Sequence, residues 1–585
     1  MKIKLNLLLI SLLIINSCDS NLPEKSDRPN FIIFIADDIS WDDFGCYGNS
    51  FVQTPNIDKL SSEGIMFSNM YLTTSSCSPS RNSIMTGRYP HNTGAPELHT
   101  EPPLDMISLA QELKTSDYFT VSSGKFHMGD YVRKGFDFIY EDKKINGLGG
   151  EEKWVTIIED RPKNKPFFLW YASYDAHRDW GENKFSGTHK VDDLTTPEYL
   201  INDSSTRLDL ANYYDEIKRF DHSIGEVIAT LKKENIYDNT FIIIMADNGR
   251  PFPHSKTRLN DQGVKTPFIL SFKNGNIHGK SNSLVSSIDI APTVLEFAGI
   301  KINKSFQGNS FKNLLDKTDQ PFRNYVFAEH NWHDFESHGR MVRNKNFMLI
   351  ENNRTQFAHL GPLDALNSES YSSLLVKKES GEISEIQSEI FVSPRPKEEF
   401  YDMQIDSFQR NNLIKDNRAQ NEINELTNKR AKDILKKLGY NKYYEHIAFI
   451  KNKLGIKPPI FSPELEDTLC NLFMETQDFH NWTKELISLR SSKEGELFRP
   501  YHFIAEDRYI SVKGPHDSIA QIIFAENDVS VSYCLLLLVN PSEHEINIPL
   551  PETCYGKKET ILLGESDSKL GTMPPFCLQV WKIIG

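Results

Sequence analysis

The stretch Phe31-Ile32-Ile33-Phe34-Ile35-Ala36-Asp37-Asp38 decides the fold class. Its six apolar residues follow one another without a polar residue, which is typical of a strand buried on both faces of a parallel sheet. The two aspartates come directly after the run, where the carboxyl end of such a strand reaches the edge of the sheet. The stretch therefore predicts an α/β protein that binds a ligand at this edge.

Three further apolar runs are followed by polar, chemically active residues. The runs and their followers are Phe119 to Ser123 with Lys125 and His127, Phe167 to Ala172 with Asp175 and His177, and Phe241 to Ala246 with Asp247 and Asn248. Because the carboxyl ends of parallel strands share one edge of a sheet, we expect all four segments to converge on one site.

Carboxylate and amide side chains at this edge predict a metal site. We expect Asp37, Asp38, Asp247 and Asn248 to be ligands. Oxygen ligands of this kind suit Ca²⁺, with Mg²⁺ as the alternative, better than Zn²⁺. Buried neighbouring carboxylates repel each other, and a divalent cation between them relieves that repulsion. Because cationic side chains lie at the same edge, the sequence also indicates an anionic substrate group such as sulfate or phosphate.

Composition and charge exclude several classes of protein. The chain has 585 residues, of which 25% are charged and 39% hydrophobic, and this composition is typical of a folded protein. Its formal net charge of -14 removes the long-range attraction that a nucleic-acid binder uses, so we expect no nucleic-acid partner. Seven cysteines in this length form no disulfide framework, and each must be judged singly.

One of these cysteines, Cys77, lies in the stretch Cys77-Ser78-Pro79-Ser80-Arg81, which reads as a loop entering a helix. The amino end of a helix binds anions and lowers the pKa of a thiol, so Cys77 could be a thiolate nucleophile. A buried, unreactive cysteine is the commoner alternative. These residues alone leave both interpretations open.

The same five residues match the Cys-x-Pro-Ser-Arg signature of type I sulfatases, in which the cysteine is oxidised to Cα-formylglycine. The resemblance runs from Arg28 to about residue 455 and includes Gly87-Arg88-Tyr89-Pro90-His91 and Gly124-Lys125-Phe126-His127-Met128-Gly129. It implies an alkaline-phosphatase-like fold with a mixed, mostly parallel central sheet and a smaller α+β subdomain.

The sulfatase resemblance also implies roles for the residues. Formylglycine 77 is hydrated and attacks sulfur, and the metal, with Cys77 among its ligands, binds a sulfate oxygen. Arg81 and Lys125 stabilise the formylglycine, and His127 takes the proton that releases sulfate. His177 and Lys256 contact sulfate, and one of them protonates the leaving group.

Within the family, the chain resembles the heparan N-sulfatase (sulfamidase) branch most closely. The stretches that carry this resemblance are Tyr174 to Arg178, Asp247 to Pro253 and Glu329 to His333. That branch has Arg where this chain has Lys256, which leaves N-sulfate and O-sulfate substrates both open. The residues that we expect to bind the substrate are His99, Asp175, His330 and His333.

The first 28 residues resemble the export signal of a bacterial lipoprotein. Lys2 and Lys4 precede the apolar run Leu5 to Ile15, which is too short to span a bilayer. Ile15-Asn16-Ser17-Cys18 resembles a lipobox, in which Cys18 is lipidated; an ordinary signal peptide is the alternative. We expect a signal peptide over residues 1–17, a tether over 18–28 and a lipid-anchored protein of the cell envelope.

Beyond the tether we expect a catalytic domain over residues 29–325 and a subdomain over 326–455. A Pro-rich linker over 456–463 leads to a helix at Glu464 to Leu489 and then to alternating runs that predict strands. We expect residues 464–585 to form an accessory domain with a β-sandwich similar to the C-terminal domain of α-amylase and pullulanase-type enzymes.

Together these features predict an exported bacterial carbohydrate sulfatase that acts on ulvan or a glycosaminoglycan and needs a formylglycine-generating maturase. An N-sulfoglucosamine sulfamidase is the main alternative. A phosphatase or phosphodiesterase would carry Thr or Ser at position 77, and a non-catalytic glycan-binding lipoprotein would not need the complete polar set.

Overall fold

The computed structural model describes residues 28–318 and 320–427, together with seven strands between residues 509 and 584. The predicted signal peptide, Cys18, the linker 456–463 and the predicted helix at 464–489 lie outside the described residues. Among the residues that are described, no helix has the length and apolar character to span a bilayer.

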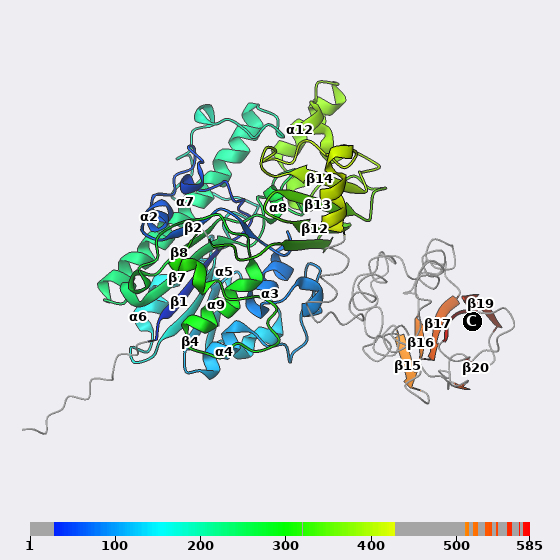
Figure 1. The fold of residues 1–585 in the computed structure, drawn as a ribbon, viewed down its shortest axis with the longest axis horizontal. Helices are drawn as coiled ribbons and strands as arrows, with labels where there is room; N and C mark the ends of the chain where they lie inside the picture. The colour runs from blue at the N-terminus through cyan, green and yellow to red at the C-terminus, as the bar shows by residue number, and fades with distance from the viewer. Residues whose placement is uncertain are drawn as a thin grey trace, which may run out of the picture.

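An eight-stranded sheet forms the centre of the molecule (Figure 1). In spatial order its strands are β5 (Phe138–Tyr140), β4 (Phe119–Gly124), β6 (Phe167–Ala172), β1 (Asn30–Ala36), β7 (Thr240–Ala246), β8 (Phe268–Ser271), β2 (Ile65–Phe67) and β9 (Gly279–Ser281). β8 is antiparallel to its neighbours β7 and β2, and the other strands of the sheet are parallel to one another. The predicted mixed, mostly parallel sheet is confirmed, and all four apolar runs are adjacent strands of it.

Successive side chains of each strand point to opposite sides of the sheet, so the unbroken apolar runs make both faces apolar. Helices cover both of these faces. Phe31, Ile33 and Ile35 face one core with side chains of α3 (Cys77–Thr86), α4 (Leu109–Thr115) and α9 (Ile290–Phe297). Ile32, Phe34 and Ala36 face a second core with α2 (Pro55–Glu63), α6 (Trp154–Asp160) and α7 (Ser204–Lys233). The unbroken apolar run of β1 is therefore explained by burial on both faces.

A separate four-stranded antiparallel sheet follows, drawn in green to yellow-green in Figure 1. Its strands are β11 (Val326–Trp332), β12 (Glu336–Arg343), β13 (Phe347–Asn352) and β14 (Glu398–Asp402). The connection from β13 to β14 contains α11 (Leu363–Leu366) and α12 (Glu369–Glu379). This sheet and its helices form the predicted smaller α+β subdomain.

The C-terminal strands are all paired in antiparallel fashion. β15 (Tyr509–Lys513), β16 (Ile519–Ile523), β17 (Tyr533–Asn540), β21 (Cys577–Ile584) and β19 (Lys558–Leu563) form one sheet, and β18 (Ile546–Asn547) pairs with β20 (Thr572–Met573). Strands therefore lie where the alternating pattern predicts them. The sandwich arrangement and the likeness to amylase-type domains stay predictions.

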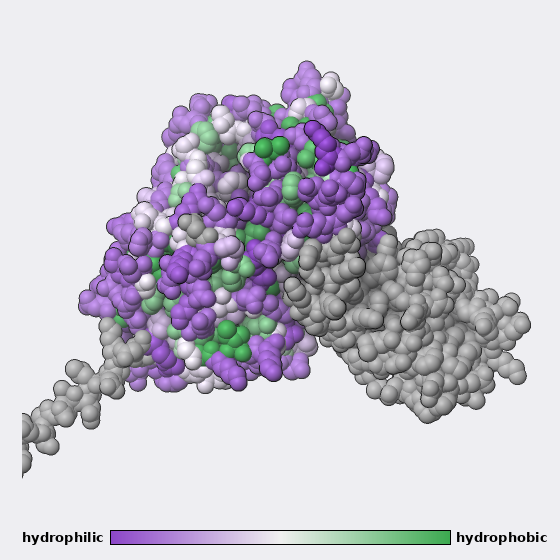
Figure 2. Space-filling model, viewed as in Figure 1, coloured by the Kyte–Doolittle hydropathy of each residue, from purple (hydrophilic) through white to green (hydrophobic). Residues whose placement is uncertain are grey.

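The surface of the described residues is mainly hydrophilic on the face in Figure 2, with small, separate apolar patches. This agrees with a mean hydropathy of -0.46 and with apolar residues gathered in the two cores beside the sheet.

Candidate active site

The carboxyl ends of β1, β4, β6 and β7 bring the four predicted segments together. Asp37 follows β1, Lys125 follows β4 and Asp247 follows β7. His177 comes from the loop after β6, whose backbone is tied to β1 because Asp37 N donates to Asp175 O and Ala176 N donates to Asp37 O. The convergence that the strand pattern predicts is present.

Cys77 begins α3 and lies against this edge. Its Sγ is 3.7 Å from Asp37 Oδ1 and 3.8 Å from Asp38 Oδ1. One ligand atom each from Asp37, Cys77 and Asp247 lie within 4.8 Å of one another, and all three residues are buried. Three of the five predicted metal ligands therefore form one compact group.

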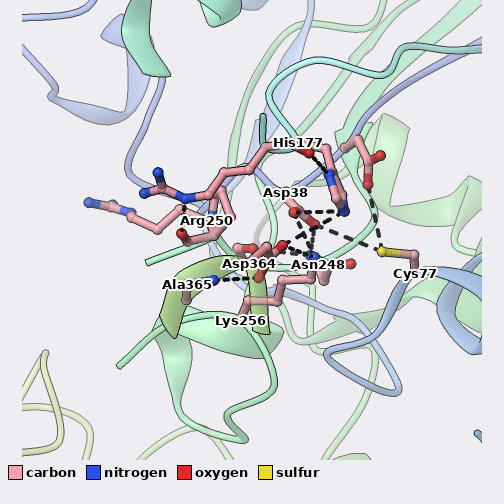
Figure 3. Close-up of polar contacts among 12 residues, drawn as sticks. Asp38, Cys77, His177, Asn248, Arg250, Lys256, Asp364 and Ala365 are labelled. Atoms are coloured by element: carbon pink, nitrogen blue, oxygen red, sulfur yellow. Dashed lines mark hydrogen bonds and ion pairs between the residues drawn. The ribbon is translucent and has the colours of Figure 1, made fainter. Parts of the chain in front are cut away.

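The other two predicted ligands, Asp38 and Asn248, are bonded to each other. Asn248 Nδ2 donates to Asp38 Oδ1 over 2.6 Å (Figure 3). Asn248 Oδ1 is buried and has no hydrogen-bond partner among the described residues. A buried amide oxygen without a partner is costly, and a metal ion is one group that satisfies it.

Buried cations surround these carboxylates. Arg81 Nε donates to Asp247 Oδ2 over 2.7 Å, and Lys125 Nζ donates to Asp37 Oδ2. Lys256 Nζ donates to Asp38 Oδ2 over 2.7 Å (Figure 3). Each predicted cation is thus held by a different predicted ligand.

Asp364 also lies in the site, although no sequence pattern pointed to it. It is on α11, and its Oδ2 accepts a 2.9 Å hydrogen bond from Lys256 Nζ. The same oxygen lies 3.7 Å from His177 Nε2, which is also 3.8 Å from Asp38 Oδ2. The smaller subdomain therefore contributes a carboxylate that contacts two of the predicted catalytic residues.

His127 and His99 are paired on another side of the site. His127 Nε2 lies 3.0 Å from His99 Nδ1, and the backbone N–H of His99 donates to Ser78 Oγ over 2.9 Å. Burial, together with the charges of Lys125 and Arg81, lowers the pKa of His127 to about 2. His127 is therefore a neutral imidazole at physiological pH.

Electrostatics do not favour a thiolate at Cys77. Burial raises the pKa of the Cys77 thiol well above its usual value, although Lys125 and Lys256 oppose that effect. Burial also raises the pKa of Asp247 to about 7, against the opposing effect of Arg81. The helix terminus alone does not make this cysteine an activated nucleophile.

A cleft of about 1150 Å³ opens onto these residues. It is lined by Cys77, Lys125, His127 and His177, and by the predicted substrate-binding residues His99, Asp175 and His333. Asp175 is already engaged there, because Arg219 Nε donates to its Oδ2 over 2.8 Å. His330 does not line this cleft but a neighbouring pocket, to which His333 also contributes.

Comparison with known proteins identifies the family. A model described as Sulfatase matches residues 29–149 and 151–300, and one described as N-sulphoglucosamine sulphohydrolase, C-terminal, matches 254–363. An ulvan-active sulfatase of Formosa agariphila is 30% identical over 411 residues, which cover 68% of this chain and 79% of that protein. The chain belongs to the sulfatase family.

This sulfatase is a type I enzyme, a sulfuric ester hydrolase. Human N-sulphoglucosamine sulphohydrolase is 27% identical to it over 454 residues, covering 69% of this chain and 90% of that enzyme. A model described as Poxvirus Late Transcription Factor VLTF3 like matches residues 397–492. That stretch contains β14, which pairs with β13 within the smaller subdomain of the sulfatase.

Solved structures share the fold of the sulfatase. One described as bound to its substrate D-glucosamine-2-N,6-O-disulfate has a TM-score of 0.55 at 20% identity, covering 70% of this chain and 98% of that chain. A second, in complex with a neocarrahexaose, has a TM-score of 0.53 at 19% identity, covering 78% and 100%. The alkaline-phosphatase-like fold that the sequence resemblance implies is confirmed.

Membership of this family implies a formylglycine and a divalent metal ion, and the sulfatase has residues that fit the ion. The site contains four carboxylates and three permanently charged cationic side chains. The carboxylates belong to Asp37, Asp38, Asp247 and Asp364, and the cations are Arg81, Lys125 and Lys256. These clustered carboxylates in a buried site, together with the unsatisfied Asn248 Oδ1, fit a divalent oxygen-bound cation, which would also favour the ionised form of Asp247.

Proposed function

We propose that this sulfatase hydrolyses sulfate esters of sulfated polysaccharides or oligosaccharides. Two ulvan-active sulfatases and a human N-sulphoglucosamine sulphohydrolase are among its relatives, and all three names are those of sulfatases of carbohydrates or their derivatives. The cleft of about 1150 Å³ has the volume of a site for a sugar or a short oligosaccharide. Ulvan and glycosaminoglycans are the substrate classes to test first.

The observation that carries this proposal is the position of Cys77 in the cleft. The residue begins α3, so the amino end of that helix faces the place where a sulfate group would lie. Lys125, His127 and His177 line the same cleft. A formylglycine at position 77 would therefore meet a sulfate ester among groups that stabilise negative charge.

Each of these residues has a part in the proposed reaction. Arg81 and Lys125 are held by Asp247 and Asp37, and they stabilise negative charge at residue 77. The neutral His127 accepts a proton from residue 77 when sulfate is released.

On the leaving-group side, His177 and Lys256 contact the sulfate ester. The Asp38 and Asp364 carboxylates hold the Lys256 ammonium, and His177 Nε2 lies within 4 Å of both. Either residue can donate the proton that the leaving sugar oxygen needs.

The charges of the site favour a sulfate ester once the metal is bound. Asp37, Asp38, Cys77, Asp247 and Asn248 would hold Ca²⁺ or Mg²⁺, and the ion supplies a Lewis acid at the sulfate oxygens. With a divalent ion bound and all four carboxylates ionised, the ion, the carboxylates and the three permanent cations sum to a charge of plus one. A sulfate ester carries one negative charge and balances this sum.

An N-sulfoglucosamine sulfamidase is the alternative. It is favoured by the match of residues 254–363 to the C-terminal model of N-sulphoglucosamine sulphohydrolase. We favour O-sulfate esters because the chain matches two ulvan-active relatives at 27% and 30% identity. A phosphatase would not need the Cys77 signature. A glycan-binding protein without catalytic activity would not need buried cations around Cys77.

Sulfate release from defined substrates tests the proposal. The protein is co-expressed with a formylglycine-generating maturase, and formylglycine at residue 77 is measured by mass spectrometry. Oligosaccharides of ulvan and of heparin, and N-sulfoglucosamine, are then incubated with the enzyme, and free sulfate is measured by ion chromatography. Release from O-sulfated sugars is expected; release from N-sulfoglucosamine alone would establish the alternative, and release of phosphate from phosphorylated sugars instead would contradict both.

We also propose that Cys18 is lipidated and holds the enzyme at the cell envelope, where it meets polymeric substrates. The support is the lipobox-like stretch Ile15-Asn16-Ser17-Cys18 after an apolar run. Labelled palmitate should enter the wild-type protein but not Cys18→Ala. Equal labelling of both forms would contradict lipidation at Cys18, and no label in either form would leave an ordinary signal peptide as the explanation.

A further inference from the structure

A second pocket of about 430 Å³ lies next to the catalytic cleft. The two cavities share the lining residues His333 and Asp334. The main lining residues of the second pocket for this argument are Thr257, His330, Phe335, Phe357, His359 and Arg395. We call it the Arg395 pocket.

The Arg395 pocket adjoins the residues that flank the catalytic groups. Thr257 directly follows Lys256, and its backbone N–H donates to Ser75 Oγ over 2.9 Å. On the shared wall, His333 Nδ1 lies 2.9 Å from the hydroxyl oxygen of Ser76, the residue before Cys77. A ligand in this pocket would therefore be next to a sulfate ester at Cys77.

Arg395 is buried there without a salt bridge among the described residues. It is 7% exposed, and of the buried arginines that the structure describes it alone has no carboxylate within 4 Å. The nearby carboxylates of Glu389 and Glu399 act on Arg395 only from a distance; the first is bonded to Arg258, and the second to Asn352 and Tyr401. Arg395 Nε is buried and has no hydrogen-bond partner in the described part of the chain. Burial lowers the pKa of Arg395 to about 10, and the guanidinium is still charged at neutral pH.

The hydrogen bonds of His359 show that it supplies no compensating charge. Arg395 Nη1 is 2.9 Å from His359 Nδ1, and because a guanidinium only donates, this nitrogen must accept. The proton of the neutral ring is therefore on Nε2, which lies 3.1 Å from Thr257 Oγ1. A buried cation with no directly bonded carboxylate is costly in a free protein and is typical of a site that an anion completes.

The acidic residues that line the Arg395 pocket are bonded elsewhere. Asp334 Oδ2 accepts the backbone N–H of Leu363 over 2.7 Å, and Glu336 accepts a hydrogen bond from Arg354. His330 Nδ1 is buried and has no hydrogen-bond partner among the described residues. It is therefore a second polar atom of the pocket that a ligand could bind.

Aromatic rings complete the pocket. Phe335 is 50% exposed and Phe357 is 53% exposed, although both are large apolar side chains. A sugar ring presents C–H groups on its faces, and aromatic side chains pack against such faces while polar groups at the edge bind its substituents. Rings beside one cation fit an anionic sugar better than a free inorganic ion.

We propose that the Arg395 pocket is a subsite for the sugar next to the one that loses sulfate, and that Arg395 binds a carboxylate or sulfate group on that sugar. This rests on the proposed function. It deepens that function because it makes the enzyme selective for oligosaccharides with a second anionic group beside the scissile sulfate. Arg395 is a specificity-determining residue in this proposal and does not touch the reacting atoms.

Binding and turnover test the subsite with separate readouts. Binding is measured by calorimetry in the Cys77→Ala background, with heparin and ulvan tetrasaccharides that are native, carboxyl-reduced or desulfated. Arg395→Met should weaken binding of native tetrasaccharides roughly tenfold, and Arg395→Lys should restore most of it. If Arg395 binds a carboxylate, carboxyl-reduced sugars should bind equally to the proteins with Arg395 and with Arg395→Met. If Arg395 binds a sulfate, desulfated sugars should bind equally to these two proteins.

Turnover separates a subsite from a structural role. With p-nitrophenyl sulfate, which has no second sugar, the kcat/KM of Arg395→Met should equal that of the wild type, whereas the KM for the tetrasaccharide should rise about tenfold. Phe335→Ala and Phe357→Ala, at half-exposed positions, should raise the same KM and spare p-nitrophenyl sulfate. Phe138→Ala is the matched control, because Phe138 is 52% exposed on β5 and lines neither cavity.

Two outcomes would overturn the subsite. One is unchanged binding and KM in the Arg395 and Phe variants; the other is an equal loss for p-nitrophenyl sulfate and tetrasaccharides. Failure of the proposed function can be distinguished from failure of the subsite. In that case the enzyme with formylglycine at residue 77 would release no sulfate from any oligosaccharide, whatever residue occupies position 395.

Discussion

Lys256 Nζ donates to Asp364 Oδ2 over 2.9 Å and thereby joins the main sheet edge to the smaller subdomain. Its second bond, 2.7 Å to Asp38 Oδ2, fixes the ammonium between two carboxylates. Burial raises the pKa of Asp364, but Lys256 and His177, together with the hydrogen bonds that the carboxylate accepts, outweigh burial and lower the pKa below its usual value. The position of a predicted catalytic cation therefore depends on a residue more than 100 positions later in the chain.

Asp364→Asn tests this dependence. The amide would leave Lys256 held by Asp38 alone, and we expect kcat for sulfate release to fall about tenfold or more with a smaller change in KM. Asp289→Asn is a matched control, since Asp289 is a buried carboxylate paired with Arg323 that does not line the cleft. It should lower the melting temperature and spare kcat. An Asp364→Asn enzyme that melts earlier but keeps its kcat would contradict the positioning role.

The strand pattern predicted the part of the site that local sequence controls. Asp37, Lys125 and Asp247 follow buried apolar runs directly, and the carboxyl ends of adjacent parallel strands bring them together whatever the connecting loops do. The Cys77 signature, which forms the first residues of helix α3, predicted how a fourth residue meets this edge.

The rest of the site depends on long-range contacts that leave no local pattern. Asp364 is on a helix of four residues in the second subdomain, and no apolar strand precedes it. Asp175 was predicted to bind substrate, but Arg219 on α7 binds its carboxylate. His330 and His333 lie in the same predicted stretch, but His333 lines both cavities whereas His330 lines the Arg395 pocket and not the catalytic cleft. These positions follow from packing between segments far apart in the chain.

Replacement of Cys77 should abolish turnover without affecting the fold. Cys77→Ala cannot form the aldehyde, and we expect sulfate release at or below about one thousandth of the wild-type rate, with an unchanged melting temperature. Cys46→Ala is the matched control because Cys46 is a half-buried cysteine away from the cleft, and its turnover should be normal. Normal turnover of Cys77→Ala would overturn the formylglycine mechanism.

Metal binding should stabilise the fold, because the ion is held only by the folded arrangement of its ligands. At 100 times the dissociation constant, Ca²⁺ would add about 2.7 kcal/mol, so we expect the melting temperature after chelation to rise by roughly 5 °C when Ca²⁺ is returned. Asn248→Ala should reduce this rise, whereas Asn202→Ala, at an exposed position, should not. A melting temperature indifferent to chelation and to Ca²⁺ would count against the metal site.

Acid should weaken the contact between Glu329 on β11 and the short helix η2 (Pro90–Thr93), which contains His91. Glu329 Oε1 accepts hydrogen bonds from His91 N over 2.8 Å and His91 Nδ1 over 2.7 Å. Burial opposes ionisation of this carboxyl, but His91 and Arg340 outweigh it and lower its pKa from 4.5 to about 2. Because the folded pKa lies below the unfolded value, the ionised carboxylate stabilises the fold above pH 4.5 and this stabilisation is lost between about pH 4.5 and 2.

The size of this effect is roughly 3 kcal/mol, since each pKa unit corresponds to about 1.4 kcal/mol. Glu329→Gln cannot ionise, so the difference in the free energy of unfolding between wild type and variant should be largest near pH 6 and shrink by pH 3. Urea unfolding at several pH values measures this difference, with Glu379→Gln at an exposed position as the control. A difference that stays constant from pH 6 to pH 3 would mean that the Glu329 charge does not stabilise the contact with His91.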